Sequence, residues 1–166
     1  MSPGTALHEA GHIVLAETFG YFALVYYQGG QLVSVYYFDG EAFVKDVIPP
    51  LCVIGMGGYA AELLFGDSVD LHGCSYDFEQ VAVTYSGSFV DSLLSQVRGS
   101  SRQAVDAIAH ELTPEQRACL YIAYDRLAER REECLETAKR LQQVPAGAKW
   151  SNAPTDQIWD SPDRPV

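Results

Sequence analysis

The sequence has few basic residues for its length. It holds 11 Lys and Arg against 22 Asp and Glu, which gives a net charge of −11 over 166 residues. Lys and Arg form no stripe, so neither a nucleic acid nor an anionic membrane surface is the expected partner. An apolar run of 18 residues and a charged-then-apolar leader are also missing. We therefore expect a soluble, cytoplasmic protein without a membrane span.

The cysteines show no C-x-x-C spacing, which predicts reduced and mostly buried thiols. The apolar fraction of 48% is that of a globular protein. We expect one domain over residues 1–144, mainly α with a small β-hairpin sheet. A Pro- and Asp-rich tail follows over 145–166, ordered at most in part, which Trp150 and Trp159 could anchor. The four cysteines are Cys52, Cys74, Cys119 and Cys134.

The feature that the sequence does contain is His8-Glu9-x-x-His12. Residues four apart lie on one face of a helix, so both imidazoles can reach one ion. Zn²⁺ favours such nitrogen ligands. Glu9 lies about 100° round the helix from His8 and can reach a water on the open position of the metal. This is the pattern of a zinc hydrolase with Glu9 as general base, and the alternative is a helix with two incidental histidines.

The flanking residues predict a buried helix from Pro3 to about Thr18. Ser2 suits the N-cap, Pro3 suits the first helical position, and Gly20 ends the helix. Gly11 costs about 1 kcal/mol inside a helix relative to Ala. We therefore expect another segment to pack close to the backbone there.

Two aromatic and β-branched segments follow, at 21–28 and 31–38, with Gly29-Gly30 between them. This pattern predicts a β-hairpin. Zinc peptidases bind substrate as an added strand on a sheet edge. The hairpin is either that edge or a purely structural element.

Helices are expected over most of the remaining chain. The first covers 51–65, where Glu62 stands among apolar residues and needs a buried partner. The next runs from Ser75, as N-cap, to about Tyr85, with Asp77 in the first turn, where the helix dipole favours an anion. The later helical segments are 89–97, 101–112, with His110 as a core or boundary residue, and 113–143.

Three short blocks of the sequence each combine glycine with histidine or acidic residues. They are Ala6-x-His8-Glu9-Ala10-Gly11-His12, Gly57-Gly58-x-Ala60-Ala61-Glu62…Phe65-Gly66, and Gly73-x-Ser75-x-Asp77-Phe78. Together they resemble the peptidase domain of the FtsH-type AAA zinc metalloproteases, in the family's order and at comparable spacing. The resemblance implies a zincin-like helical metallopeptidase domain in which Asp77 is the third zinc ligand.

The sequence also departs from that family. The second block is one residue shorter, has one acid where the family usually has two, and has Tyr59 in place of Arg. The G-x-x-x-x-G-K-[ST] phosphate loop and the membrane anchor are missing. The chain therefore resembles either a stand-alone peptidase or a fragment of a longer protein. The third block replaces Thr, Ala and Asn by His72, Cys74 and Tyr76.

A catalytic zinc ion needs a third protein ligand besides the two histidines. Asp77 is the first choice, because the resemblance and its position at a helix start agree. Glu62 is the second choice, or else an acceptor for the remaining N–H of a ligand imidazole. The third choices are His72 and Cys74.

Two functions fit these residues. The first is a zinc-dependent metalloendopeptidase for peptides or unfolded polypeptides, in which Glu9 takes a proton from the zinc-activated water. The second is a catalytically idle zinc-binding regulatory or interaction module that keeps the peptidase fold. The missing ATPase and the altered blocks favour the second function, and the intact Glu9 favours the first. A separate ATPase or another protein could act as partner.

Overall fold

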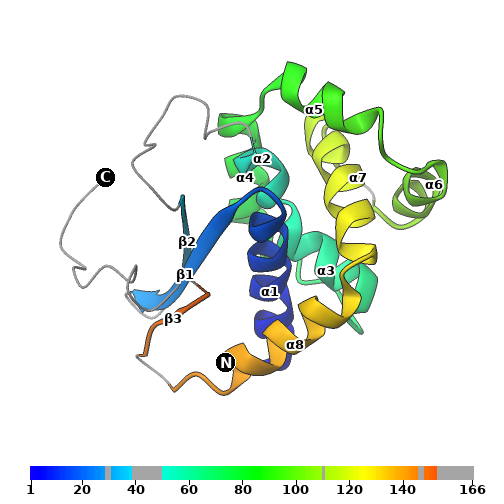
Figure 1. Cartoon of the computed structure of the whole chain (residues 1–166). Helices are drawn as coiled ribbons and strands as arrows, with labels where there is room; N and C mark the ends of the chain where they lie inside the picture. The colour runs from blue at the N-terminus through cyan, green and yellow to red at the C-terminus, as the bar shows by residue number, and fades with distance from the viewer. Residues whose placement is uncertain (29–30, 39–49, 110, 146–147, 153–166) are drawn as a thin grey trace.

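The chain folds into a group of helices around one buried helix, with a small sheet on one side (Figure 1). The computed structural model describes residues 1–28, 31–38, 50–109, 111–145 and 148–152, and for 27–28 and 31–38 the backbone alone. The mainly helical class expected from the sequence is confirmed. None of the described helices is both long and apolar enough to cross a membrane. The helices are α1 (Pro3–Thr18), α2 (Leu51–Ile54), α3 (Gly57–Phe65), α4 (Ser75–Thr84), α5 (Gly87–Leu94), α6 (Gly99–Ile108), α7 (Pro114–Ala128) and α8 (Arg131–Gln142), and the strands are β1 (Tyr21–Gln28), β2 (Gln31–Phe38) and β3 (Trp150–Ser151).

Helix α1 has the ends that the sequence predicts. The Ser2 side chain accepts a hydrogen bond from the backbone of the first turn, where Pro3 stands. Gly20 has a φ of 80°, and its N–H donates to Glu17 O at 3.0 Å. A left-handed glycine therefore closes the helix.

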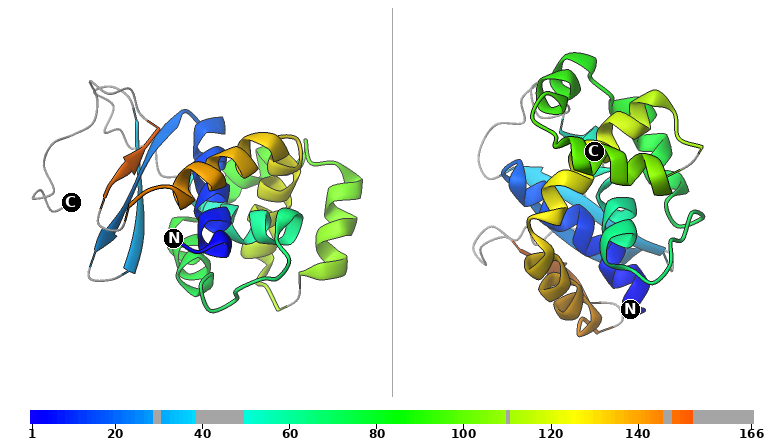
Figure 2. Two further views of the ribbon diagram at one scale, coloured as in Figure 1. Left: turned by 90° about the horizontal axis from the view of Figure 1, so that it is seen from below. Right: turned by 90° about the vertical axis from the view of Figure 1, so that its right-hand side faces the viewer.

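Helix α1 is enclosed because it is apolar on nearly every side. All residues from 6 to 16 are buried. The helix packs against α3 and α8 and also touches β1, α2 and α7, and Figure 2 shows it between the sheet and the other helices. A helix of this kind belongs in a core. It carries the polar residues His8, Glu9 and His12 inside, where they need partners.

Helices α1 and α3 meet backbone to backbone at two glycines. A methyl group on Gly11 would lie 2.2 Å from Gly57 O and 2.6 Å from Ala61 Cβ. A methyl group on Gly57 would lie 2.8 Å from Gly11 O. Only hydrogen fits at these distances. The close neighbour that the sequence led us to expect at Gly11 is therefore α3.

The sheet has the order β2-β1-β3 and is antiparallel. β1 and β2 pair along their whole length, which confirms both strands of the expected hairpin. Its Gly29-Gly30 turn lies outside the described residues. Along β1, Tyr21, Ala23 and Val25 are buried and alternate with half-buried residues. This is the period of a strand with one face on the core.

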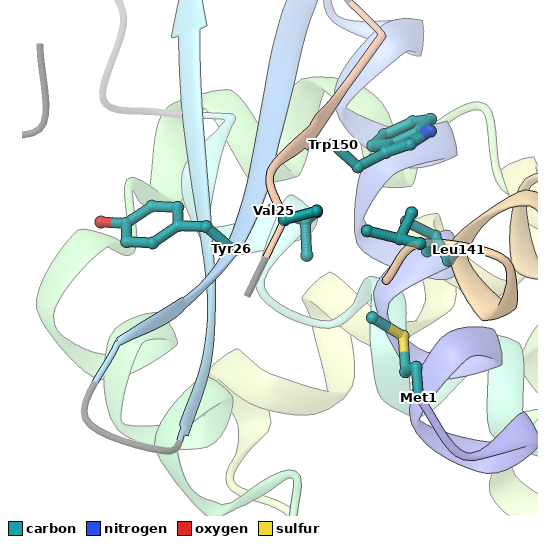
Figure 3. A pocket seen from close by; sticks show the side chains of 7 residues that line it. Met1, Val25, Tyr26, Leu141 and Trp150 are labelled. Atoms are coloured by element: carbon teal, nitrogen blue, oxygen red, sulfur yellow. The ribbon is translucent and has the colours of Figure 1, made fainter. Parts of the chain in front are cut away.

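The third strand comes from the segment expected to be a tail. β3 pairs with β1 on the side away from β2. Trp150 lies near Val25 and Leu141, between the sheet and the end of α8 (Figure 3). Trp150 thus anchors the start of the tail, as expected, whereas Trp159 lies outside the described residues.

The expected helix 51–65 is wrong in one respect, because it is divided into α2 and α3. The break falls at Gly55 and Met56. Gly55 N donates to Leu51 O at 2.8 Å and ends the first turn. The carbonyl of Ile54 then accepts a side-chain hydrogen bond, which is described below. The apolar periodicity continues across the break and so does not reveal it.

The expected helix 113–143 is also wrong, since it consists of α7 and α8. They are separated at Glu129 and Arg130. Arg130 Nη1 donates to Val14 O at 3.1 Å. The turn directs α8 back onto α1 rather than away from it. Helices α5 and α6 correspond to the expected segments 89–97 and 101–112 but begin and end earlier, and His110 lies outside the described residues.

The crossing of α1 and α3 predicts a steric limit at Gly11. Gly11→Ala places a methyl group against Gly57 O, so the free energy of unfolding should fall by about 1–3 kcal/mol or more. The matched control is Gly4→Ala, because Gly4 is exposed on the same helix and its added methyl group would meet nothing within 4 Å. That variant should gain up to about 1 kcal/mol. Urea unfolding followed by circular dichroism measures both changes, and equal stabilities would contradict the close crossing.

Candidate metal centre

The first two donors lie one turn apart on the buried helix α1. His8 and His12 are 9% and 4% exposed. Their Nε2 atoms are 3.0 Å apart, and their rings meet edge to face with centroids separated by 4.7 Å. Both nitrogens therefore point at one place, as the four-residue spacing predicts.

The third donor comes from α4. Asp77 lies in the first turn of that helix. Its Oδ2 is 3.0 Å from His8 Nε2 and 3.3 Å from His12 Nε2. The structure thus brings the first choice for the third ligand to the two histidines, and the three residues form a group that could hold a metal ion.

The Nδ1 atoms of both histidines have acceptors of their own. His12 Nδ1 lies 2.8 Å from Ile54 O, the carbonyl at the break between α2 and α3. His8 Nδ1 lies 2.8 Å from Glu62 Oε1. A carbonyl and an ionised carboxylate only accept hydrogen bonds, so both Nδ1 atoms donate. In the neutral imidazoles, both Nε2 atoms then carry lone pairs.

Three acceptor atoms therefore converge on one buried point. Asp77 Oδ2 is buried and has no hydrogen bond of normal geometry to any described residue. Two imidazole lone pairs and a carboxylate oxygen repel one another at this range unless positive charge lies between them. A metal cation supplies that charge, and nitrogen and carboxylate donors suit Zn²⁺. The residues therefore fit the ion that the sequence motif implies.

The pKa values of His8, His12 and Asp77 are shifted because these three side chains lie close together. Burial alone would lower the pKa of His8, but the interactions with Asp77, Cys74 and Glu62 together outweigh burial and raise the pKa to about 12. The pKa of His12 is also raised, because the charge of Asp77 outweighs burial. Burial would raise the pKa of Asp77, yet the two histidines hold it well below its usual range. A centre that favours positive charge this strongly attracts a proton or a metal ion, and the two compete.

Glu62 orients His8 and fixes the loop that leads to Asp77. It is 6% exposed, on α3. Its Oε1 faces His8, and its Oε2 accepts a hydrogen bond from Asp70 N at 2.7 Å. Asp70 Oδ1 in turn accepts one from Gly73 N at 3.0 Å. One carboxylate thus joins α1, α3 and the loop before α4, which is the acceptor role that the sequence left open for Glu62.

Gly58 keeps the space beside the imidazoles free. A methyl group on Gly58 would lie 2.5 Å from His8 Nε2 and 2.6 Å from His12 Nε2. Any larger residue would therefore press on the two nitrogen donors. The small residues of this helix indicated close packing, but only the crossing with α1 shows that the space borders the three possible metal donors.

Glu9 follows His8 on α1 and is 9% exposed. It lies outside the group of three donors. Its charge nevertheless contributes to the raised pKa of His12, so the carboxylate is near the donors without being one of them. A carboxylate in this position can accept a proton from a water molecule at the metal.

The other residues considered from the sequence occupy different places. Cys74 is buried, with Sγ 3.8 Å from His8 Nδ1, and burial raises the pKa of its thiol. His72 is exposed and belongs to no donor group among the described residues. The sequence did not indicate Ile54, because the role of its carbonyl as acceptor for His12 depends on where a helix breaks. A backbone carbonyl leaves no signal of this kind in a sequence.

The donor geometry predicts the metal content. The purified chain should hold about one zinc ion, and Asp77→Ala should lose most of it. Glu62→Ala should weaken zinc binding by about 10–100-fold, because His8 loses the acceptor that orients it. His72→Ala removes a nearby histidine that is not a donor and is the control. Elemental mass spectrometry and zinc titration provide the measurement, and full zinc in Asp77→Ala together with none in Glu62→Ala would show that the ligand assignment is wrong.

Comparison with known proteins assigns neither a family nor a function to the chain. No protein-family model matches the chain, and neither a curated protein nor a solved structure matches it. The interpretation of this centre therefore depends on the donor geometry described above.

Proposed function

We propose that the protein is a zinc-dependent metalloendopeptidase that cleaves peptides and unfolded polypeptides. The observation that carries the proposal is the convergence of His8 Nε2, His12 Nε2 and Asp77 Oδ2 at 3.0–3.3 Å. Three protein donors are the number found in catalytic zinc sites, whereas structural sites use four. A buried carboxylate, that of Glu9, stands next to them.

Each of these side chains would have a separate role in the reaction. His8, His12 and Asp77 would hold the ion. Bound zinc polarises a peptide carbonyl and lowers the pKa of a water molecule towards about 7. Glu9 accepts the proton of the attacking water and delivers it to the leaving amine. Glu62 keeps His8 in the tautomer whose Nε2 lone pair faces the ion.

The proposed substrate class is supported by the sheet. β1 is paired on both sides, whereas β2 has one neighbour among the described strands. An extended peptide can add to such an edge through backbone hydrogen bonds. A folded domain must open before it can present an extended strand. We therefore propose β2 as the binding edge and peptides, loops and unfolded chains as the substrates.

Replacement of Glu9 tests the proposed chemistry. Glu9→Gln removes the base but none of the three donors. It should leave folding and zinc content unchanged and lower casein cleavage by about 10²-fold or more. Glu79→Gln, exposed on α4, is the control and should keep full activity. If the zinc-loaded wild-type chain cleaves nothing across a broad peptide library, the protein is instead a zinc-binding regulatory module.

Folded substrates provide a second test. A typical domain is stable by roughly 5–15 kcal/mol, so its unfolded fraction is very small. The sequence contains no G-x-x-x-x-G-K-[ST] loop to couple ATP to unfolding. We expect the purified chain to spare a stably folded reporter and to cut a destabilised variant of the same reporter, with or without ATP. Gel analysis follows both reporters, and rapid loss of the stable one or stimulation by ATP would refute this expectation.

A further inference from the structure

A second group of metal donors lies on the other side of the His8 ring. His8 Nδ1 is 2.8 Å from Glu62 Oε1 and 3.8 Å from Cys74 Sγ, and one donor atom from each residue lies within 4.8 Å of the other two. We call His8 Nδ1, Glu62 Oε1 and Cys74 Sγ the inner triad. The outer triad is His8 Nε2, His12 Nε2 and Asp77 Oδ2.

The two triads differ in the cations that they suit. The outer triad offers nitrogen and oxygen, whereas the inner triad adds sulfur. A thiolate selects softer, thiophilic cations over harder ones. Cys74 is fully buried and Glu62 nearly so, so a cation held there would be shielded from water. The peptidase proposal gives the thiol of Cys74 no task.

Both triads need the same imidazole. A neutral imidazole has one N–H and one lone pair. The outer triad uses the lone pair on Nε2 of His8, with the hydrogen on Nδ1 facing Glu62. The inner triad uses the lone pair on Nδ1, which moves the hydrogen to Nε2. As a neutral ring, His8 therefore serves one triad at a time.

We propose that the inner triad is an inhibitory metal site that takes a thiophilic divalent cation and withdraws His8 from the outer triad. The proposal rests on the proposed function only in that the outer triad holds zinc. Bonds form from the cation to Cys74 Sγ, His8 Nδ1 and Glu62 Oε1, and the bond from His8 Nε2 to zinc breaks. The thiol proton goes to solvent, the imidazole proton moves from Nδ1 to Nε2, and no atom changes its oxidation state. The outer triad then retains two donors and releases its zinc.

The test adds cadmium to the zinc-loaded full chain. Sulfur-to-cadmium charge-transfer absorption in the ultraviolet reports a bond to Cys74, and elemental mass spectrometry of the desalted protein counts both metals. We expect about one cadmium ion to bind per chain and about one zinc ion to leave as the absorption appears. Peptidase activity is not needed for either readout.

Two variants assign the effect to the inner triad. Cys74→Ala should abolish the absorption and raise the cadmium concentration that expels zinc by at least about tenfold. Cys134→Ala is the control, because Cys134 is an equally buried thiol in neither triad, and it should respond like the wild type. If Cys74→Ala does not fold, Cys74→Ser replaces it with the same expectations, since a hydroxyl does not bind cadmium as a thiolate does.

Three results would overturn the proposal. Absorption that persists without Cys74 would come from another thiol. Zinc release that is unchanged without Cys74 would mark plain exchange at the outer triad. Cadmium bound through sulfur while zinc stays would show that both triads fill together. A wild-type chain without zinc before cadmium is added would count against the proposed function, whereas the absorption and its dependence on Cys74 test the inner triad itself.

Discussion

The candidate metal centre depends on how closely α1 and α3 approach one another. Helices ordinarily pack with axes about 8–10 Å apart, according to the side chains between them. Here Gly11 and Gly57 meet with no side chain between the backbones. That approach brings Glu62 to the Nδ1 side of His8 and Gly58 to its Nε2 side. A single methyl group at the crossing would push the two helices apart and move Glu62 and Gly58 away from His8. Glu62 would then no longer hold the imidazole hydrogen of His8 on Nδ1.

Much of this arrangement could be predicted from the sequence, because it follows from backbone geometry. Residues four apart on a helix share a face, so His8 and His12 had to point the same way. The cap at Ser2 and the closing Gly20 also act within one turn of the chain. Glu62 is a lone acid among apolar residues and therefore needed a buried polar partner, which is His8. The prediction of Asp77 as the third ligand also needed the family resemblance, because no local sequence pattern relates Asp77 to His8.

The remaining features depend on contacts that no local pattern encodes. The helix breaks at Gly55 and at Arg130 follow from the way in which the later segments turn back onto α1. The acceptor role of Ile54 O follows from the first of these breaks. β3 forms because two residues near the end of the described chain meet an open side of β1. The distance of 3.8 Å between Cys74 and His8 likewise exists only once the loop before α4 has folded over Glu62.

The outer triad joins the first helix to the fourth. In the unfolded chain, Asp77 is far along the sequence from His8 and His12, so the complete set of donors exists only after folding. A cation held there acts as a cross-link that the unfolded chain cannot form. By mass action, each tenfold rise in free zinc above its dissociation constant would add about 1.4 kcal/mol to the folding free energy. The stability of the fold would then rise with the free zinc of its surroundings, and a chelator would lower that stability.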